Sequence, residues 1–411
     1  MLEAVREHVF ALPSLAKFAI VLAVIVAVPA LSRRIRLPAS VGLVLFGVIL
    51  GPHVLGFFGE DRPTANFFAE LGKLLLMFSA GLEIDMGLFR QARTRSFIFG
   101  IITTSVPLLL GTFAGLATGY PLIPAIVIGS LLASHTLLGL SIITDLGGIG
   151  LEPVIVTIGA TVLSDTLSLI VFAICVSTFT TGFSVSGLAM QLAEIAVFVP
   201  LILFGLSGVG AYVLKKMEKK EDAHFLVMLA ILAVAGVMAH FVNLPDIVGA
   251  FLAGLAVNGA VRDKPSKAKL EFLGKSLFIP SFFIVTGFLI DPVSFVSSTI
   301  DNFRVVAGII VSLVAGKWIA AAICGRIFHY RPEARLTMWA LTLPQVAATL
   351  AAALVAHQTL NPLGQPLLDG TMLNAVLVLM LVTSILGPVL TDRFARQMIG
   401  RVEQQPIVVT R

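Results

Sequence analysis

One carboxylate lies deep inside an apolar stretch of the chain. Asp165 is about halfway along TIGATVLSDTLSLIVFAI, with apolar turns on both sides. A charge at that depth in a membrane helix is costly unless it is partnered or neutralised, so Asp165 is a functional candidate. Thr161 and Ser168 share its helix face and, with Ser164, form a polar stripe that suits a dehydrated monovalent cation. The alternative is a protonated Asp165 that only ties two helices together.

A lysine occupies a similar depth in another apolar run. VVAGIIVSLVAGKWIAAAICGRI places Lys317 too far from either end for its side chain to reach the membrane surface comfortably. A buried ammonium needs an anion, and Asp165 is the deepest carboxylate in the chain. We therefore predict that Lys317 forms an ion pair with Asp165 in at least one state. The alternative is that Lys317 binds carbonyl groups at a helix C-terminus and is structural only.

Polar residues interrupt a further apolar run, AIVIGSLLASHTLLGLSIITDLG. Ser134, His135 and Thr136 lie at its centre, and Ser and Thr side chains can satisfy backbone groups that are freed when a membrane helix breaks. We predict a break here. His135 could titrate near neutral pH and take part in proton movement, although a buried histidine that is simply hydrogen-bonded is the commoner case.

A second interruption is predicted in LTMWALTLPQVAATLAAALVA, where Thr342, Pro344 and Gln345 lie at the corresponding depth. Pro344 lacks a backbone donor and its ring clashes with the carbonyl four residues earlier, so the helix should break or kink. Two broken helices meeting at one depth would direct opposing dipole ends at each other. Asp165 and Lys317 could offset those ends.

The composition places these residues in a membrane protein. Of 411 residues, 57% are apolar and 12% charged, and the mean hydropathy is +1.01. These values exclude a water-soluble enzyme, a nucleic-acid binder and a disordered scaffold. Since a spanning helix needs about 20 apolar residues, we predict an all-α protein of about thirteen transmembrane helices: 14–32, 37–57, 64–84, 96–118, 122–144, 151–179, 187–215, 223–242, 245–261, 270–290, 302–328, 335–357 and 371–392.

Lysine and arginine residues gather in alternate loops, at 33–36, 90–95, 215–220, 262–269, 326–335 and 393–401. Cytoplasmic loops carry such an excess, which places the N-terminus outside the cell membrane and the C-terminus in the cytoplasm. This pattern accounts for the net charge of +5 without a nucleic-acid partner. We identify no cleaved signal peptide.

The chain is predicted to hold a single transmembrane domain, residues 1–400, and a short cytoplasmic tail, 401–411, without a soluble regulatory domain. The lysine-rich stretch KKMEKKED near the middle separates two inverted repeats, 14–179 and 223–392, which helix 187–215 links. No phosphate loop, zinc-ligand spacing or nucleophile–base pair stands out, so neither enzyme activity nor a cofactor is expected.

Four segments resemble signatures of the monovalent cation:proton antiporter family, which contains the Kef-type potassium efflux proteins and bacterial sodium/proton exchangers. They are ELGKLLLMFSAGLEID (70–85), SDTLSLI (164–170), LPDIVGAFLAGLAVNG (244–259) and LFIPSFFIVTGFLID (277–291). The resemblance implies a homodimer, and a mobile core of helices four to six and eleven to thirteen with two crossed broken helices. It also implies that Asp165 is the ion-binding aspartate and Lys317 the core lysine of the sodium-exchanging branch.

Two departures from the family patterns bear on function. Electrogenic members have two adjacent acids at this point, whereas here Ser164 precedes Asp165, which favours one-for-one exchange. The potassium efflux branch usually has a glutamine before the aspartate and a long nucleotide-binding tail, and neither is found here. Ligand gating of that kind is not expected.

These observations predict a secondary active antiporter that exchanges Na⁺ or K⁺ for protons by alternating access in the lipid bilayer. Asp165 would hold either a proton or the cation, with further ligands from Thr161, Ser164, Ser134, Thr136 and Gln345. If Lys317 also lost its proton, two protons would move per cation. The alternatives are a sodium-coupled importer of organic anions with Lys317 as counter-ion, a cation channel, and a membrane sensor without transport.

Overall fold

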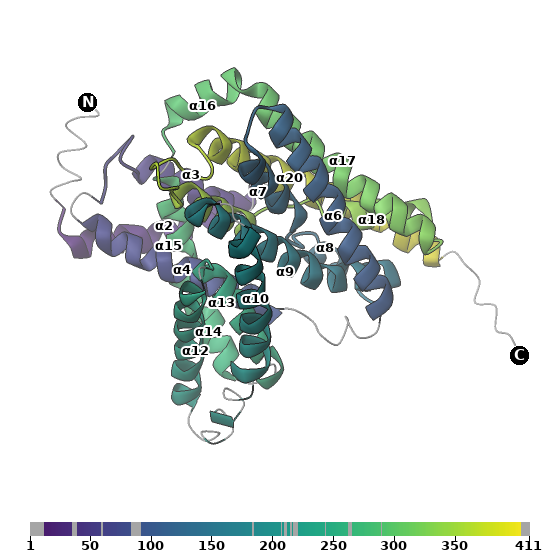
Figure 1. The fold of residues 1–411 in the computed structure, drawn as a ribbon, viewed down its shortest axis with the longest axis horizontal. Helices are drawn as coiled ribbons and strands as arrows, with labels where there is room; N and C mark the ends of the chain where they lie inside the picture. Colours follow the sequence, from purple (N-terminus) through teal and green to yellow (C-terminus); the bar gives the residue numbers. More distant parts are fainter. Residues whose placement is uncertain are drawn as a thin grey trace, which may run out of the picture. The chain divides into compact units, whose positions relative to one another are not determined.

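The computed structural model describes residues 12–403 except 35–38, 59–60, 84–91, 183–184, 207, 209–211, 214–215, 217–220, 243, 262–264 and 289. Within these limits every regular element is a helix (Figure 1). The chain divides into two compact units. Unit 1 comprises residues 1–84, 176–301 and 360–365, and unit 2 comprises 85–175, 302–359 and 366–411. The predicted cytoplasmic tail lies outside the described residues from 404 onward.

The all-helical membrane fold is confirmed. Among the described residues, eight helices are long and apolar enough to cross a membrane, and five shorter apolar helices accompany them. The predicted number of about thirteen spans therefore remains a prediction. So do the two inverted repeats and the linker helix, part of which falls on undescribed residues.

The described helices of unit 1 come mainly from two stretches of the chain that are far apart in sequence, 14–83 and 185–301. They are α2 (Ser14–Arg34), α3 (Ala39–Leu50), α4 (Arg62–Glu83), α10 (Val185–Pro200), the π-helix η2 (Leu201–Leu206), α12 (Glu221–Phe241), α13 (Asp246–Val261), α14 (Pro265–Leu273), the π-helix η3 (Gly274–Phe278), α15 (Ile279–Gly287) and α16 (Pro292–Asp301).

Glycine permits two close helix crossings in unit 1. Between α4 and α13, a Cβ on Gly254 would lie 2.1 Å from the carbonyl oxygen of Phe78. Between α3 and α15, a Cβ on Gly47 would lie 2.0 Å from the carbonyl oxygen of Ile284. Both gaps are too small for any side chain. Small residues thus bring the backbones together, as close packing in lipid requires.

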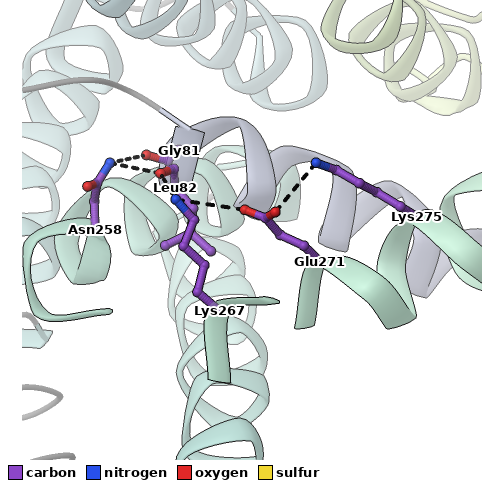
Figure 2. Close-up of polar contacts among 6 residues, drawn as sticks. All are labelled: Gly81, Leu82, Asn258, Lys267, Glu271 and Lys275. Carbon is purple, nitrogen blue, oxygen red and sulfur yellow. Dashed lines mark hydrogen bonds and ion pairs between the residues drawn. The ribbon is translucent and has the colours of Figure 1, made fainter. Parts of the chain in front are cut away.

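Side chains from α13 and α14 cap the C-terminal end of α4 (Figure 2). Asn258 Nδ2 donates to the carbonyl oxygens of Gly81 and Leu82 at 3.2 and 3.0 Å, and Lys267 Nζ donates to that of Leu82 at 3.1 Å. The Glu271 carboxylate lies 3.8 Å from Lys267 Nζ and 3.5 Å from Lys275 Nζ. Two of the last carbonyls of α4 therefore have side-chain donors, and Glu271 balances the added charge.

Unit 2 contains α6 (Arg93–Ala117), α7 (Leu122–Ala133), α8 (Leu140–Asp145), most of α9 (Glu152–Thr181), α17 (Phe303–Ile327), α18 (Pro332–Leu341), α19 (Ala347–Gln358) and α20 (Gly370–Glu403). These are the segments that the family resemblance assigns to the core. Helices α6 and α17 lie side by side (Figure 1). The predicted spans 122–144 and 335–357 are each divided between two helices, with non-helical residues between them.

Candidate functional site

The two helix breaks of unit 2 are joined through their backbones. The first break separates α7 from α8, and the second separates α18 from α19. The backbone N–H of Thr136 in the first break donates to the carbonyl oxygen of Pro344 in the second, at 2.8 Å. Helix α20 approaches Pro344 closely because residue 387 is glycine: a Cβ there would lie 2.4 Å from the proline Cγ. Two extended segments thus meet inside the unit.

Gln345 ties the second break to its surroundings. Its Nε2 donates to the Ser134 carbonyl oxygen at 2.6 Å, its Oε1 accepts the hydroxyl hydrogen of Thr349, and its backbone N–H donates to Thr383 Oγ1 at 3.0 Å. The side chain is fully buried. In this structure the amide holds the two breaks together, and its predicted role as an ion ligand remains a prediction.

Thr342 ends the helix before that break. It is the C-cap of α18, and its hydroxyl donates to the Trp339 carbonyl oxygen at 3.0 Å. The pairing of Gln345 with Thr383 was not predicted from the sequence. The signal was the dipeptide Thr383-Ser384 within the otherwise apolar run LVLMLVTSILG of α20.

Lys317 binds backbone carbonyls. Its ammonium donates to Ala133 at 2.7 Å and to Thr103 at 3.1 Å, and the side chain is 0% exposed. Ala133 is the last residue of α7, so the lysine lies at the negative end of that helix dipole. Helices α17 and α6 pack closely beside it, because a Cβ on Gly316 would lie 3.0 Å from Pro107 Cα.

The predicted ion pair between Lys317 and Asp165 is not formed in this structure. No carboxylate among the described residues lies within 4.0 Å of the Lys317 ammonium. The arrangement that was considered as the alternative, binding to carbonyl groups at a helix C-terminus, is the one observed. A direct pair remains a prediction for another state of the protein.

The Asp165 carboxylate has few contacts. One oxygen accepts from the backbone N–H of His135 at 3.5 Å, and the other has no hydrogen bond or ion pair with any described residue. The side chain is partly exposed, whereas the neighbouring Ser164 is fully buried. An acid with an unused oxygen at the centre of an apolar helix can bind a proton or a cation at modest steric cost.

His135 bridges two hydroxyls of α9. Its Nε2 lies 3.1 Å from Thr161 Oγ1, and its Nδ1 lies 3.3 Å from Ser164 Oγ. Both hydroxyls are also placed to donate to backbone carbonyls, of Thr157 and Thr161 respectively. If they do so, both ring nitrogens must donate, which only the charged imidazolium can. A neutral His135 requires one hydroxyl to turn its hydrogen toward the ring, so its protonation is coupled to the hydroxyls beside Asp165.

The predicted site residues all fall in unit 2, and three contact networks connect most of them. Asp165, Thr161 and Ser164 contact His135; Lys317 contacts the residue before Ser134; and Gln345 contacts Ser134 itself. No group of three or more His, Cys, Asp or Glu side chains in the described part of the chain could hold a metal ion. A cation at Asp165 would depend on one carboxylate with hydroxyl and carbonyl oxygens.

Comparisons with known proteins agree with this architecture. The family model for the transmembrane part of sodium/hydrogen exchangers matches residues 20–396. The Na⁺/H⁺ antiporter NhaS5 of Synechocystis sp. is 44% identical over 378 residues, which are 92% of this chain and 54% of that protein. This chain thus spans about half the length of that relative. The probable Na⁺/H⁺ antiporter 3 of Methanocaldococcus jannaschii is 26% identical over 346 residues, 83% of this chain and 88% of that protein.

A solved structure gives the same result for the fold. The sodium proton antiporter MjNhaP1 from Methanocaldococcus jannaschii, at pH 8, superposes with a TM-score of 0.73 at 16% identity and covers 94% of this chain and 98% of its own. At that identity the likeness supports the fold alone. Because the family model matches nearly the whole chain, the protein belongs to the family of transmembrane sodium/hydrogen exchangers.

Proposed function

We propose that the protein is a secondary active antiporter that exchanges a monovalent cation for protons, with Asp165 as the binding site. The observation that carries this proposal is the carboxylate itself: it lies at the middle of α9, has one unpartnered oxygen and is not neutralised by Lys317. Family membership and the activities for which the relatives are named favour this function over an organic-anion importer or a channel. The exchange requires no cofactor.

Competition for one carboxylate is sufficient for exchange. When the cation leaves, a proton neutralises Asp165, and the neutral site can cross the low-dielectric barrier; an empty, charged site would be costly to move. Alternating access then couples the two fluxes without any further chemistry. The relatives that carry Na⁺/H⁺ in their names make Na⁺ the first cation to test, with K⁺ as the second.

The remaining ligands come from the elements that meet beside Asp165. The hydroxyls of Thr161 and Ser164 are held against His135, and a turn of that ring would release them. Ser134, Thr136 and Gln345 lie in the joined breaks, where a small separation would free carbonyl and amide oxygens for a hard alkali ion. Cation binding is thereby linked to movement of the broken helices.

Lys317 has two roles in this proposal. At rest it neutralises the carbonyl end of α7, and after the breaks separate it can pair with Asp165 in the cation-free state. If it keeps its proton, the exchange is one cation for one proton, as the serine at position 164 favours. If it releases its proton as well, two protons move per cation. His135 relays protons by the hydroxyl coupling described above.

The assembly and topology are proposed on the same grounds. We propose a homodimer in the cell membrane because the family resemblance implies one. We place the N-terminus outside and the C-terminus in the cytoplasm because the basic residues gather in alternate loops. No nucleic-acid partner is needed to explain the charge. Single cysteines placed in the 90–95 and 215–220 loops test this orientation. If a membrane-impermeant reagent labelled them in intact cells, these loops would lie outside and the proposed orientation would be wrong.

Proteoliposomes with an internal pH dye test the proposal. Na⁺, Li⁺ and K⁺ are added in turn, and the transported cation should alkalinise the lumen through the wild type. It should do so equally through Asp392→Asn, which removes a surface carboxylate that pairs with Arg396 in α20. Asp165→Asn should abolish the signal for every cation. Exchange that persists in Asp165→Asn, uptake of an organic anion driven by Na⁺ without a pH change, or single-channel current steps would each overturn the proposal.

A further inference from the structure

A pocket on unit 2 lies between α17 and α18, formed by residues that the proposed exchange does not use. Its volume is about 170 Å³, and it is lined by Trp318, Ala322, Arg326, Pro332, Arg335 and Leu336. Four of these side chains are apolar or largely so, and two are guanidinium groups. The surface of the pocket is almost wholly apolar, and two of the residues that line it are arginines.

Arg335 is built into this pocket. Its Nε donates to the Tyr330 carbonyl oxygen at 2.7 Å. Its stem crosses α17 at Gly325, where a Cβ would lie 2.2 Å from Arg335 Cγ, so only glycine allows this path. The two terminal nitrogens have no other hydrogen bond or ion pair with described residues, and they remain available to an external anion.

Arg326 supplies the second charge from α17. It is exposed, and its one contact among the described residues is a 3.5 Å approach to the carbonyl oxygen of Ala322 in the same helix. No described carboxylate lies within 4.0 Å of it. Arg326 and Arg335, on neighbouring helices, thus both line the pocket, and neither guanidinium group has a carboxylate counter-ion among the described residues.

Trp318 extends the pocket toward the middle of the membrane. It precedes Arg326 by two turns, about 12 Å along the helix, and its side chain is 50% exposed. The distance from the charged head of a phospholipid to the upper part of its acyl chain is similar. Trp318 and Arg326 thus follow along the helix the order of apolar and charged groups in one lipid molecule.

We propose that this pocket binds an anionic phospholipid. The phosphate would be held between Arg326 and Arg335, and the upper acyl chain would lie along Trp318, Ala322 and Leu336. Guanidinium groups bind phosphate oxygens through paired hydrogen bonds, which an ammonium cannot do. Phosphatidylcholine should bind less well, because its headgroup carries a positive charge that the arginines would repel. Free phosphate should also bind less well, because it has no acyl chain to cover the apolar residues.

Native mass spectrometry of the purified protein in detergent tests the proposal. It compares the binding of phosphatidylglycerol and phosphatidylcholine with identical acyl chains. The wild type should bind phosphatidylglycerol preferentially. The double variant Arg326→Gln/Arg335→Gln should bind it roughly 25-fold more weakly, at about fivefold per guanidinium. Arg326→Gln alone should lower the affinity for phosphatidylglycerol about fivefold. Because this change breaks no contact between helices, its effect cannot be attributed to misfolding.

The matched control is Arg331→Gln/Arg393→Gln, which removes two exposed arginines of the same unit that do not line the pocket. It should retain wild-type affinity within about twofold, since surface charge outside the pocket acts only at long range. The proposal is overturned if the pocket variant binds like the wild type, if the control loses as much affinity, or if inorganic phosphate displaces the lipid at equal concentration.

Discussion

Each unit places a lysine ammonium on the carbonyl end of a helix, but the two lysines are balanced differently. In unit 1, Lys267 caps α4 beside Glu271, with its side chain 22% exposed (Figure 2). In unit 2, Lys317 caps α7, is fully buried and has no carboxylate within 4.0 Å in the described part of the chain. In unit 1 the ammonium therefore has both a carbonyl to bind and a carboxylate to balance its charge. The cap in unit 2 leaves a buried charge that can respond to an ion.

Asp61 of unit 1 and Asp165 of unit 2 show a similar contrast. Asp61 accepts the Ser14 hydroxyl hydrogen at 2.7 Å and pairs with Lys17 Nζ at 2.9 Å. Among the described residues, Asp165 has one hydrogen bond, from the His135 backbone N–H at 3.5 Å. Asp61 thus has both a hydrogen-bond donor and a counter-ion, whereas Asp165, where we propose transport, has only a weak backbone contact. Four variants, in order of decreasing effect, test that distinction.

The largest effect is expected from Lys317→Met. It leaves the carbonyls of Thr103 and Ala133 buried without a donor, at about 1–3 kcal/mol each, and removes the charge that Asp165 would meet. Cation-driven exchange should be lost and the thermal midpoint should fall strongly. The matched variant Lys267→Met should cost at most about 1 kcal/mol, because water and Asn258 can replace the lysine. Equal losses in the two variants would remove the contrast between the caps.

Gly387→Ala should come next. Its Cβ would lie 2.4 Å from Pro344 Cγ, so α20 and the second break must shift, at about 1–3 kcal/mol. Gly254→Ala introduces a similar clash in unit 1, against the Phe78 carbonyl. Both variants should lower the melting temperature, but only Gly387→Ala should raise the cation concentration needed for half-maximal exchange. A shift in that concentration with Gly254→Ala would show that the breaks are not the sensitive element.

Ser164→Ala should have a moderate effect. The alanine removes the oxygen next to His135 Nδ1 but leaves Asp165 and both helix breaks in place. We expect exchange to persist, slowed about tenfold or less as for loss of one proton-transfer partner, with an altered pH profile. Thr180→Ala, a hydroxyl of the same helix outside the site, is the control. An unchanged pH profile in Ser164→Ala would exclude the hydroxyl relay.

The smallest effect concerns Asp61. The hydrogen bond from Ser14, and then the ammonium of Lys17, lower the pKa of this carboxyl below its usual value. A lowered pKa in the folded state contributes stability that is present above the unfolded pKa, about 4, and is lost as the pH falls through the folded value. Thermal melts of the wild type and Asp61→Asn should therefore differ slightly at pH 7 and converge below that range. High salt should narrow the difference.

The sequence showed which polar groups interrupt the apolar helices, but it did not show which groups they contact. Asp165, Lys317 and the two breaks could be recognised because charges and proline are rare and costly within apolar helices. The partners of Lys317 could not, since Thr103 and Ala133 contribute backbone carbonyls, which every residue has. For the same reason the sequence could not show that the Gln345 amide donates to the Ser134 carbonyl and joins the two breaks. Thr383 was not predicted as a partner because its neighbours in the sequence are mostly apolar.

The account depends on competition between a cation and a proton at one carboxylate. Cation-induced proton release from the purified protein in weakly buffered detergent solution measures this directly. We predict that Na⁺ or K⁺ releases protons from the wild type, that the apparent cation affinity falls as the pH is lowered, and that Asp165→Asn releases none. An affinity that is independent of pH, or an undiminished release from Asp165→Asn, would contradict the claim.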